Sequence, residues 1–118
     1  MDIKGTARRV TVFLGESDKL HHRPLFEVIV QEARAAGIAG ATAWRGQIGF
    51  GRTARVRSAA VLDLSTDLPV IIEIVDDAAK IEPFLKKLEA LFEQADSGGL
   101  VTLEDVEVHR YTGHDRRR

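Results

Sequence analysis

The sequence predicts an α+β sandwich whose elements follow the order strand, helix, strand, strand, helix, strand. Residues 7–14 and 68–77 alternate in hydropathy at the two-residue period of a strand, whereas residues 25–36 and 81–92 place apolar side chains at helical spacing. Polar or glycine-rich turns separate these segments. Because crossover connections are right-handed, this order folds into a four-stranded antiparallel sheet with both helices on one face, the ferredoxin-like βαββαβ arrangement.

The first half of the chain supplies one strand and one helix. In "ARRVTVFL", residues 7–14, three apolar side chains share one face: Val10, Val12 and Leu14. Pro24 presets φ for a first helical turn, and Gly37 allows the left-handed backbone that ends a helix, with Ile38 placed to pack on the last turn. We therefore expect a helix from Pro24 to Ala36.

Three strand segments are expected in the middle of the chain. "ATAWRGQI" (residues 41–48) and "AAVLDL" (residues 59–64) are interpreted as a strand and its continuation on either side of an arginine-bearing loop. "LPVIIEIVDD" (residues 68–77) is the clearest strand, because one of its faces is wholly apolar: Val70, Ile72 and Ile74.

The second helix has a complete apolar stripe, made by Ile81, Phe84, Leu85, Leu88, Leu91 and Phe92. Asp76 or Asp77 could cap it. Pro83 removes a helical hydrogen bond, so we expect a short opening turn or a kink before the main helix. "DSGG" (residues 96–99) ends the helix, and "LVTLEDVEVHRY" (residues 100–111) is expected to be an edge or half-exposed strand.

Length and composition predict one intracellular domain. The chain has 118 residues, which fits a single domain over residues 1–113 followed by a disordered basic tail at 114–118. A formal net charge of −1 argues against a general nucleic-acid binder, and the absence of cysteine excludes disulfides, thiolate metal sites and cysteine nucleophiles. No signal peptide or membrane-spanning apolar run is present, so we expect a cytoplasmic protein.

One face of the predicted sheet is too apolar for permanent exposure. Phe13, Ile71 and Val75 fall on the face that the helices leave open. We therefore expect the chain to associate through this face.

Residues 44–58, "WRGQIGFGRTARVRS", form a local cluster of positive charge. No acid lies between Glu32 and Asp63, but five arginines do: Arg34, Arg45, Arg52, Arg55 and Arg57. Three glycines would let backbone N–H groups face an anion beside these arginines: Gly46, Gly49 and Gly51. The stretch has neither the Walker nor the dinucleotide pattern, and a solvated hairpin with a glycine bulge is the alternative.

Other segments allow a functional and a structural interpretation. "SGGLVT" (residues 97–102) ends the second helix. It could also be a second anion-binding segment if an oligomer brings it near residues 44–58. Within "GESDKLHHRP", a divalent cation could be bound by Glu16, Asp18, His21 and His22, which otherwise form a hydrogen-bonded loop. Trp44 could stack on a base or cover the sheet. No acid, base and nucleophile set stands out, so a small ferredoxin-like enzyme is the weakest hypothesis.

Four segments together resemble a known family. They are "GESDK", "PLFEVIVQEARAAGIAGATAWRGQIGFG", "DLPVIIEIVDD" and "GLVTLEDVEVHRY", in that order. The resemblance is to the family catalogued as domain of unknown function 190 (DUF190) and covers about residues 3–112. That family is similar to the PII signalling proteins, which have the ferredoxin-like fold, form trimers and bind adenine nucleotides in clefts between subunits.

Part of the PII nucleotide site has counterparts in this chain. The PII stretch "KGFGRQ" lies against the phosphates and leads into a long partner-binding loop. Here "IGFGRT" matches it at Gly49, Phe50, Gly51 and Arg52, and the loop from Arg52 to Ser58 is shorter. The PII stretch "TGxxGDGKI" is matched by "DSGGLV" only at Gly98 and Gly99, without the phosphate-contacting lysine.

At the C-terminal end, "HRYTG" stands where PII proteins have "RIRTG", so His109 and Tyr111 replace two phosphate-facing arginines. Together with the missing lysine, these departures imply a ligand less charged than a triphosphate. A mono- or diphosphate adenine nucleotide, or a different anion, fits them.

The resemblance implies a non-enzymatic PII-like regulatory protein. It would be a homotrimer that binds a small anionic ligand between subunits and regulates a partner protein through the 47–58 loop. The expected roles are phosphate contact from Gly49, Gly51 and Arg52, closure of the site by Gly98 and Gly99 of a neighbour, and contact with partner or ligand by Arg55 and Arg57.

The resemblance implies no certain cofactor, and an adenine nucleotide is the candidate for the small anionic ligand. The partner is an unidentified protein, a membrane transporter being one candidate, and neither nucleic-acid binding nor membrane insertion is expected. The alternative is a metal-responsive trimer, like CutA, that uses residues 15–22.

Overall fold

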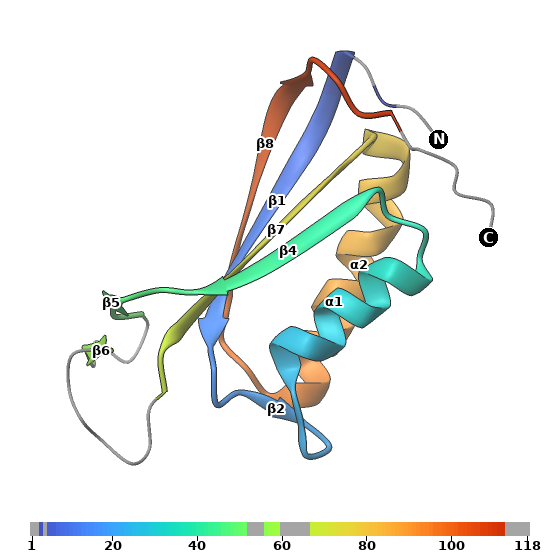
Figure 1. Cartoon of the computed structure of the whole chain (residues 1–118). Coiled ribbons are helices and arrows are strands. Elements are labelled where there is room, and N and C mark those ends of the chain that lie inside the picture. The colour runs from blue at the N-terminus through green and yellow to red at the C-terminus, as the bar shows by residue number, and fades with distance from the viewer. Residues whose placement is uncertain (1–2, 4, 52–55, 60–66, 113–118) are drawn as a thin grey trace, which may run out of the picture.

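The computed structural model describes residue 3 and residues 5–51, 56–59 and 67–112. Four long strands form the main sheet: β1 (Gly5–Gly15), β4 (Gly40–Arg45), β7 (Pro69–Asp76) and β8 (Leu100–Val108). Two helices, α1 (Leu25–Ala35) and α2 (Ala78–Ala95), lie side by side on one face of this sheet (Figure 1). The strand order is β4-β7-β1-β8 with every neighbouring pair antiparallel. The predicted α+β, ferredoxin-like fold is therefore confirmed.

The hydrophobic core lies between the sheet and the two helices. The strands contribute Val10, Val12 and Leu14 from β1 and Val70, Ile72 and Ile74 from β7. The helices contribute Leu25, Val28, Ile29, Ala33, Ile81, Phe84, Leu88, Leu91 and Phe92. Full burial of one such Leu, Ile, Val or Phe side chain stabilises the fold by about 1.5–3 kcal/mol, so this layer is the main source of stability.

Helix α1 has the termini that its sequence predicts, within one residue. Pro24 precedes the first helical residue, and Gly37 adopts the left-handed conformation with φ +75°. The N–H of Ile38 donates to the carbonyl of Ala33 at 3.1 Å, which satisfies one of the last helical carbonyls. The chain then turns into β4, an edge strand that pairs with β7 alone.

Helix α2 differs from the expectation at its start. One α-helix runs from Ala78 to Ala95 with Pro83 inside it, so a separate opening turn is wrong, whereas the alternative of a kink at Pro83 stays a prediction. Pro83 is exposed, whereas Ile81 and Phe84 beside it are buried in the core. Packing of this face against the sheet offsets the hydrogen bond that proline removes.

The two aspartates before α2 have different roles from those expected. Asp77 occupies the N-cap position but makes no side-chain capping bond. Asp76 is fully buried, and its carboxylate accepts the N–H of Asp77 at 2.7 Å and that of Ala39 at 2.9 Å. The carboxylate of Asp76 therefore links the start of α2 to the turn between α1 and β4.

The remaining strands form two small hairpins. β2 (Lys19–Leu20) pairs with β3 (Arg23–Pro24), and β5 (Ile48–Gly49) pairs with β6 (Arg57–Ser58). The expected 41–48 strand is therefore split, because β4 ends at Arg45. Of the expected 59–64 segment only its first residue is described, with the N–H of Ala59 donating to the carbonyl of Gln47, and residues 60–64 lie outside the described residues.

The open face of the sheet carries an apolar row at one end. In register across the four strands lie Trp44, Ile71, Phe13 and Leu100. Trp44, Phe13 and Leu100 remain 45%, 40% and 57% exposed. Because a continuous apolar row on a sheet face is normally covered, this end is suited to packing against another subunit.

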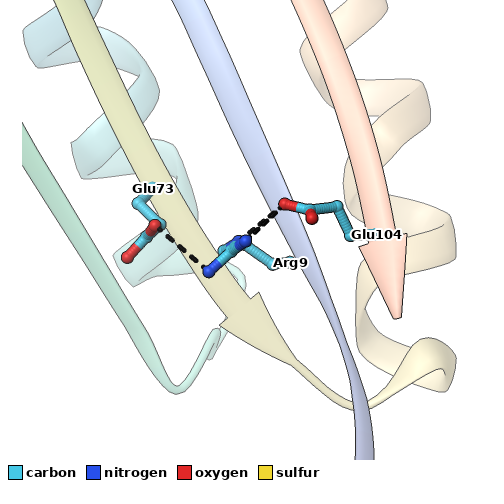
Figure 2. A network of polar contacts seen from close by, with 3 residues as sticks. All are labelled: Arg9, Glu73 and Glu104. Carbon is cyan, nitrogen blue, oxygen red and sulfur yellow. Dashed lines mark hydrogen bonds and ion pairs between the residues drawn. The ribbon is translucent and has the colours of Figure 1, made fainter. Parts of the chain in front are cut away.

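The other end of the open face is charged (Figure 2). Arg9 on β1 reaches across to Glu104 on β8, with Nε 2.9 Å from Oε1, and its Nη1 lies 3.8 Å from Glu73 Oε2 on β7. The hydrogen bond to Glu104 raises the pKa of Arg9 above its ordinary value, and the charges of Glu104 and Glu73 act in the same direction. Arg9 therefore joins three strands of the sheet.

Candidate functional site

The glycines of the "GQIGFG" stretch lie at the end of β4 and have two different environments. Gly46 donates its N–H to the carbonyl of Pro69 at 2.7 Å, and a β-carbon on Gly46 would lie 3.1 Å from Pro69 Cγ. A β-carbon on Gly49 would lie 3.4 Å from the same atom, but one on Gly51 would meet nothing within 4 Å. Gly46 thus has a packing role, whereas the backbone at Gly51 is open to an approaching group.

The hairpin beyond β4 is well exposed. Gly49 pairs with Arg57 across the β5–β6 ladder, and Phe50 is 71% exposed. Arg52 and Arg55 lie outside the described residues. The described part of the hairpin holds Gly49, Phe50 and Gly51 beyond the end of β4, and their contact with a ligand stays a prediction.

Gly98 and Gly99 form the corner between α2 and β8. Asp96 ends α2 in the left-handed conformation with φ 52°, and Ser97 donates its N–H to the carbonyl of Phe92. A β-carbon on Gly99 would lie 2.5 Å from Phe92 Cε1 and 3.0 Å from the carbonyl oxygen of Phe13. A close approach of helix and strand therefore explains glycine at position 99 without a ligand.

Within one chain the two glycine segments lie at the same end of the sheet, and the strands next to them are its opposite edges. β4 and β8 are the edge strands, and three strand intervals separate them. At about 4.8 Å per interval, this separation is about 14 Å. Within one chain, the strands that lead into and out of the two segments are therefore not neighbours.

The "GESD" loop connects both glycine segments to the end of β1. Glu16 accepts hydrogen bonds from Arg45 at the end of β4, with Arg45 Nε 2.5 Å from Glu16 Oε2. Ser97 Oγ, beside Gly98, donates to Asp18 Oδ2 at 2.9 Å, and Gly15 donates its N–H to the same oxygen at 3.2 Å. Sequence reasoning missed both contacts, because the partners are distant in the chain.

These contacts bear on the metal alternative for residues 15–22. Glu16 and Asp18 already accept hydrogen bonds, and His21 and His22 lie in the exposed turn between β2 and β3 with φ 49° and 74°. Among the residues that the structure describes, no three histidine, aspartate or glutamate side chains gather in a way that could hold a metal ion. The described geometry therefore does not favour a cation site in this segment.

The C-terminal segment meets the opposite end of the sheet. Tyr111 donates its hydroxyl to the carbonyl of Ala39 at 2.7 Å and accepts the N–H of Ile3 at its own carbonyl. His109 is exposed. Tyr111 therefore has a structural partner within the chain, at the turn before β4 and at the opposite end of the sheet from Gly49.

Solved structures place this fold in a recognised class. The structure is similar to that of CPII, a nitrogen regulatory PII-like protein from Thiomonas intermedia K12 solved with ADP, AMP and bicarbonate, with a TM-score of 0.67 at 20% identity over 89% of this chain and 90% of that one. It is similar to a putative PII-like signalling protein from Thermus thermophilus, with a TM-score of 0.65 at 17% identity over 92% and 94%. The fold is thus PII-like.

Sequence comparison shows the family. Residues 7–108 match the model of DUF190, described as Uncharacterized ACR, COG1993, and the chain belongs to this family. A UPF0166 protein of Aquifex aeolicus (strain VF5) is 34% identical over 82% of this chain and 88% of its own length. A UPF0166 protein of Methanocaldococcus jannaschii is 35% identical over 88% and 93%. The resemblance expected from the sequence is confirmed.

Proposed function

We propose that this chain is a non-enzymatic, PII-like regulatory protein that binds an adenine nucleotide between the subunits of a homotrimer. One observation carries the proposal: the two glycine segments lie at one end of the sheet but at opposite edges, an arrangement that favours a site completed by neighbouring subunits. ADP and AMP are present in structures of CPII, whose fold is similar. The lysine and arginines of the PII triphosphate site are missing here, which favours the less charged AMP or ADP.

In this proposal, Gly49, Gly51 and Arg52 contact the phosphates, and Phe50 lies beside them. Gly98 and Gly99 of the neighbour close the site, with Gly99 fixed by packing and Gly98 offering its exposed backbone. Arg55 and Arg57 face the ligand or the partner.

The open face of the sheet supplies the trimer contact. Its apolar row, Trp44, Ile71, Phe13 and Leu100, runs across all four strands and is suited to burial by other copies of the chain.

The regulated partner is a protein that recognises the 47–58 loop, a membrane transporter being one candidate. The nucleotide would change the population of loop states by its difference in affinity for them. Within the described part of the chain, no helix is long and apolar enough to cross a membrane. We place this function in the cytoplasm.

A thermal-shift titration with AMP and ADP, combined with a mass measurement in solution, tests the proposal. At one hundred times its dissociation constant a ligand adds about 2.7 kcal/mol, which is several degrees for a domain of this size. Arg52→Ala should reduce the shift, whereas Arg34→Ala, in the last turn of α1, should not. No shift with either nucleotide, or a monomeric mass, would refute the proposed site.

A further inference from the structure

An ion pair beside the glycine hairpin involves an arginine to which the proposed function gives no role. Nε and Nη2 of Arg45 both lie 2.5 Å from one oxygen, Oε2, of Glu16. The two side chains differ in exposure, since Arg45 is 61% exposed and Glu16 only 20%. The carboxylate is therefore the fixed member of the pair, and the guanidinium is the accessible one.

The backbone holds Glu16 in place. Its N–H donates to the carbonyl of Leu68 at 2.9 Å, and the N–H of Ser17 donates to Asp67 Oδ1 at 2.8 Å. Asp18 is held by Gly15 and Ser97. The loop that carries the carboxylate is thus anchored at three consecutive residues.

Arg45 is close to the proposed phosphate contacts. It is the last residue of β4, and Gly46 follows it directly. Gly46 and Gly49 both lie over the Pro69 ring, within 3.1 and 3.4 Å of its Cγ when given a β-carbon. The guanidinium therefore starts from the same end of the sheet as Gly49 and Gly51.

We propose that Arg45 is a phosphate ligand of this site and that Glu16 is its built-in competitor. A guanidinium binds phosphate with the same paired donors that it offers a carboxylate, and a phosphate carries more charge. A nucleotide phosphate at Gly51 would take Arg45 from Glu16, so Glu16 lowers nucleotide affinity and releases the Arg45 guanidinium only when ligand is bound. This inference rests on the proposed function and adds a positive group from outside the PII-matched positions.

The test measures ADP affinity by calorimetry on the full chain and three variants. Glu16→Gln should tighten ADP binding about fivefold, the upper range for breaking an exposed ion pair. Arg45→Gln should weaken ADP binding about tenfold, the scale of one charge-assisted hydrogen bond. The double variant should bind like Arg45→Gln alone, because Glu16 acts through Arg45.

Glu32→Gln is the matched control. It removes the same charge from another exposed pair, since Glu32 Oε1 lies 3.4 Å from Lys87 Nζ on the helical face, and it should leave ADP affinity unchanged. A merely structural role for the Glu16–Arg45 pair predicts that Glu16→Gln leaves ADP affinity unchanged or weakens it, and either result overturns the proposal.

The two proposals can fail separately. If the unaltered chain binds ADP and Glu16→Gln does not bind it more tightly, the competitor role is wrong and the proposed function stands. If neither the unaltered chain nor any variant binds ADP, both fall together. Glu16→Gln keeps the size of the side chain and one acceptor oxygen, so this variant should fold normally. Its ADP affinity alone tests the competitor role, even if Arg45→Gln does not fold.

Discussion

The carboxylate of Asp76 accepts the backbone N–H of Ala39 across 37 positions of sequence, at 2.9 Å and fully buried. The same carboxylate accepts the N–H of Asp77. One side chain thus sets the turn before β4 and the start of α2. Since β4 leads directly into the glycine hairpin, this buried group helps to position the candidate site from the far end of the sheet.

Replacing Asp76 with alanine should lower the free energy of unfolding by about 3 kcal/mol. Two backbone N–H groups would lose their acceptor, and leaving a buried donor unsatisfied costs about 1–3 kcal/mol. Asp77→Ala is the matched control, because the side chain of Asp77 is exposed and makes no capping bond; its cost should stay under about 1 kcal/mol. Urea unfolding monitored by circular dichroism measures both, and equal losses would contradict the role of Asp76.

Gly99→Ala should destabilise the chain by about 1–3 kcal/mol, the usual cost of overpacking. The new methyl group would lie 2.5 Å from the buried ring of Phe92 and 3.0 Å from the Phe13 carbonyl, so the ring has to move. Gly40→Ala, where a β-carbon meets nothing within 4 Å, should be neutral or slightly stabilising. Thermal unfolding of the two variants measures both effects. A Gly99→Ala protein as stable as the unaltered chain would show that the corner between α2 and β8 can accommodate a methyl group.

The strands were predicted correctly where burial of one sheet face makes apolar residues alternate along the sequence. Val10 and Val12 on β1, and Ile72 and Ile74 on β7, are buried because alternate strand residues face the helices, and that alternation is visible in the sequence. The separate opening turn before Pro83 was wrong, since a local rule for proline takes no account of the packing of Ile81 and Phe84 around it.

The candidate site could be predicted only in part. The glycine and arginine stretch was visible as a local pattern, and the family resemblance pointed to the same residues. The contact of Glu16 with Arg45 spans 29 positions and exists only once the strand order is set. An acid-free stretch of sequence therefore has an acidic neighbour in the fold, which no count of local charge could reveal.

Asp18 and Ser97 should show an energetic coupling. Ser97 Oγ donates to Asp18 Oδ2 at 2.9 Å and so joins the β1–β2 loop to the corner after α2. Ser97→Ala should cost about 1 kcal/mol and Asp18→Ala more, because Asp18 also accepts the N–H of Gly15. In a double-mutant cycle the loss of stability in the double variant should be about 0.5–2 kcal/mol smaller than the sum of the two single losses. Additive losses in urea unfolding would mean that the hydrogen bond contributes nothing.

Phe13→Glu should convert the assembly to monomers. Phe13 lies in the middle of the apolar row, opposite Ile71 on one side and Leu100 on the other, and a carboxylate there would be desolvated by any subunit that covers the face. The side chain points to the open face, away from the core, so each subunit should keep its fold. Ala35→Glu, at an exposed position on α1, adds the same charge and should leave the assembly intact.

Sedimentation velocity measures the mass of the Phe13→Glu protein in solution, and circular dichroism shows whether it is folded. A monomeric, folded Phe13→Glu protein that no longer shows a thermal shift with ADP would connect the open face, the oligomer and the between-subunit site in one result. A Phe13→Glu protein with the mass of the unaltered chain would show that the subunits meet elsewhere. The apolar row would then need another cover.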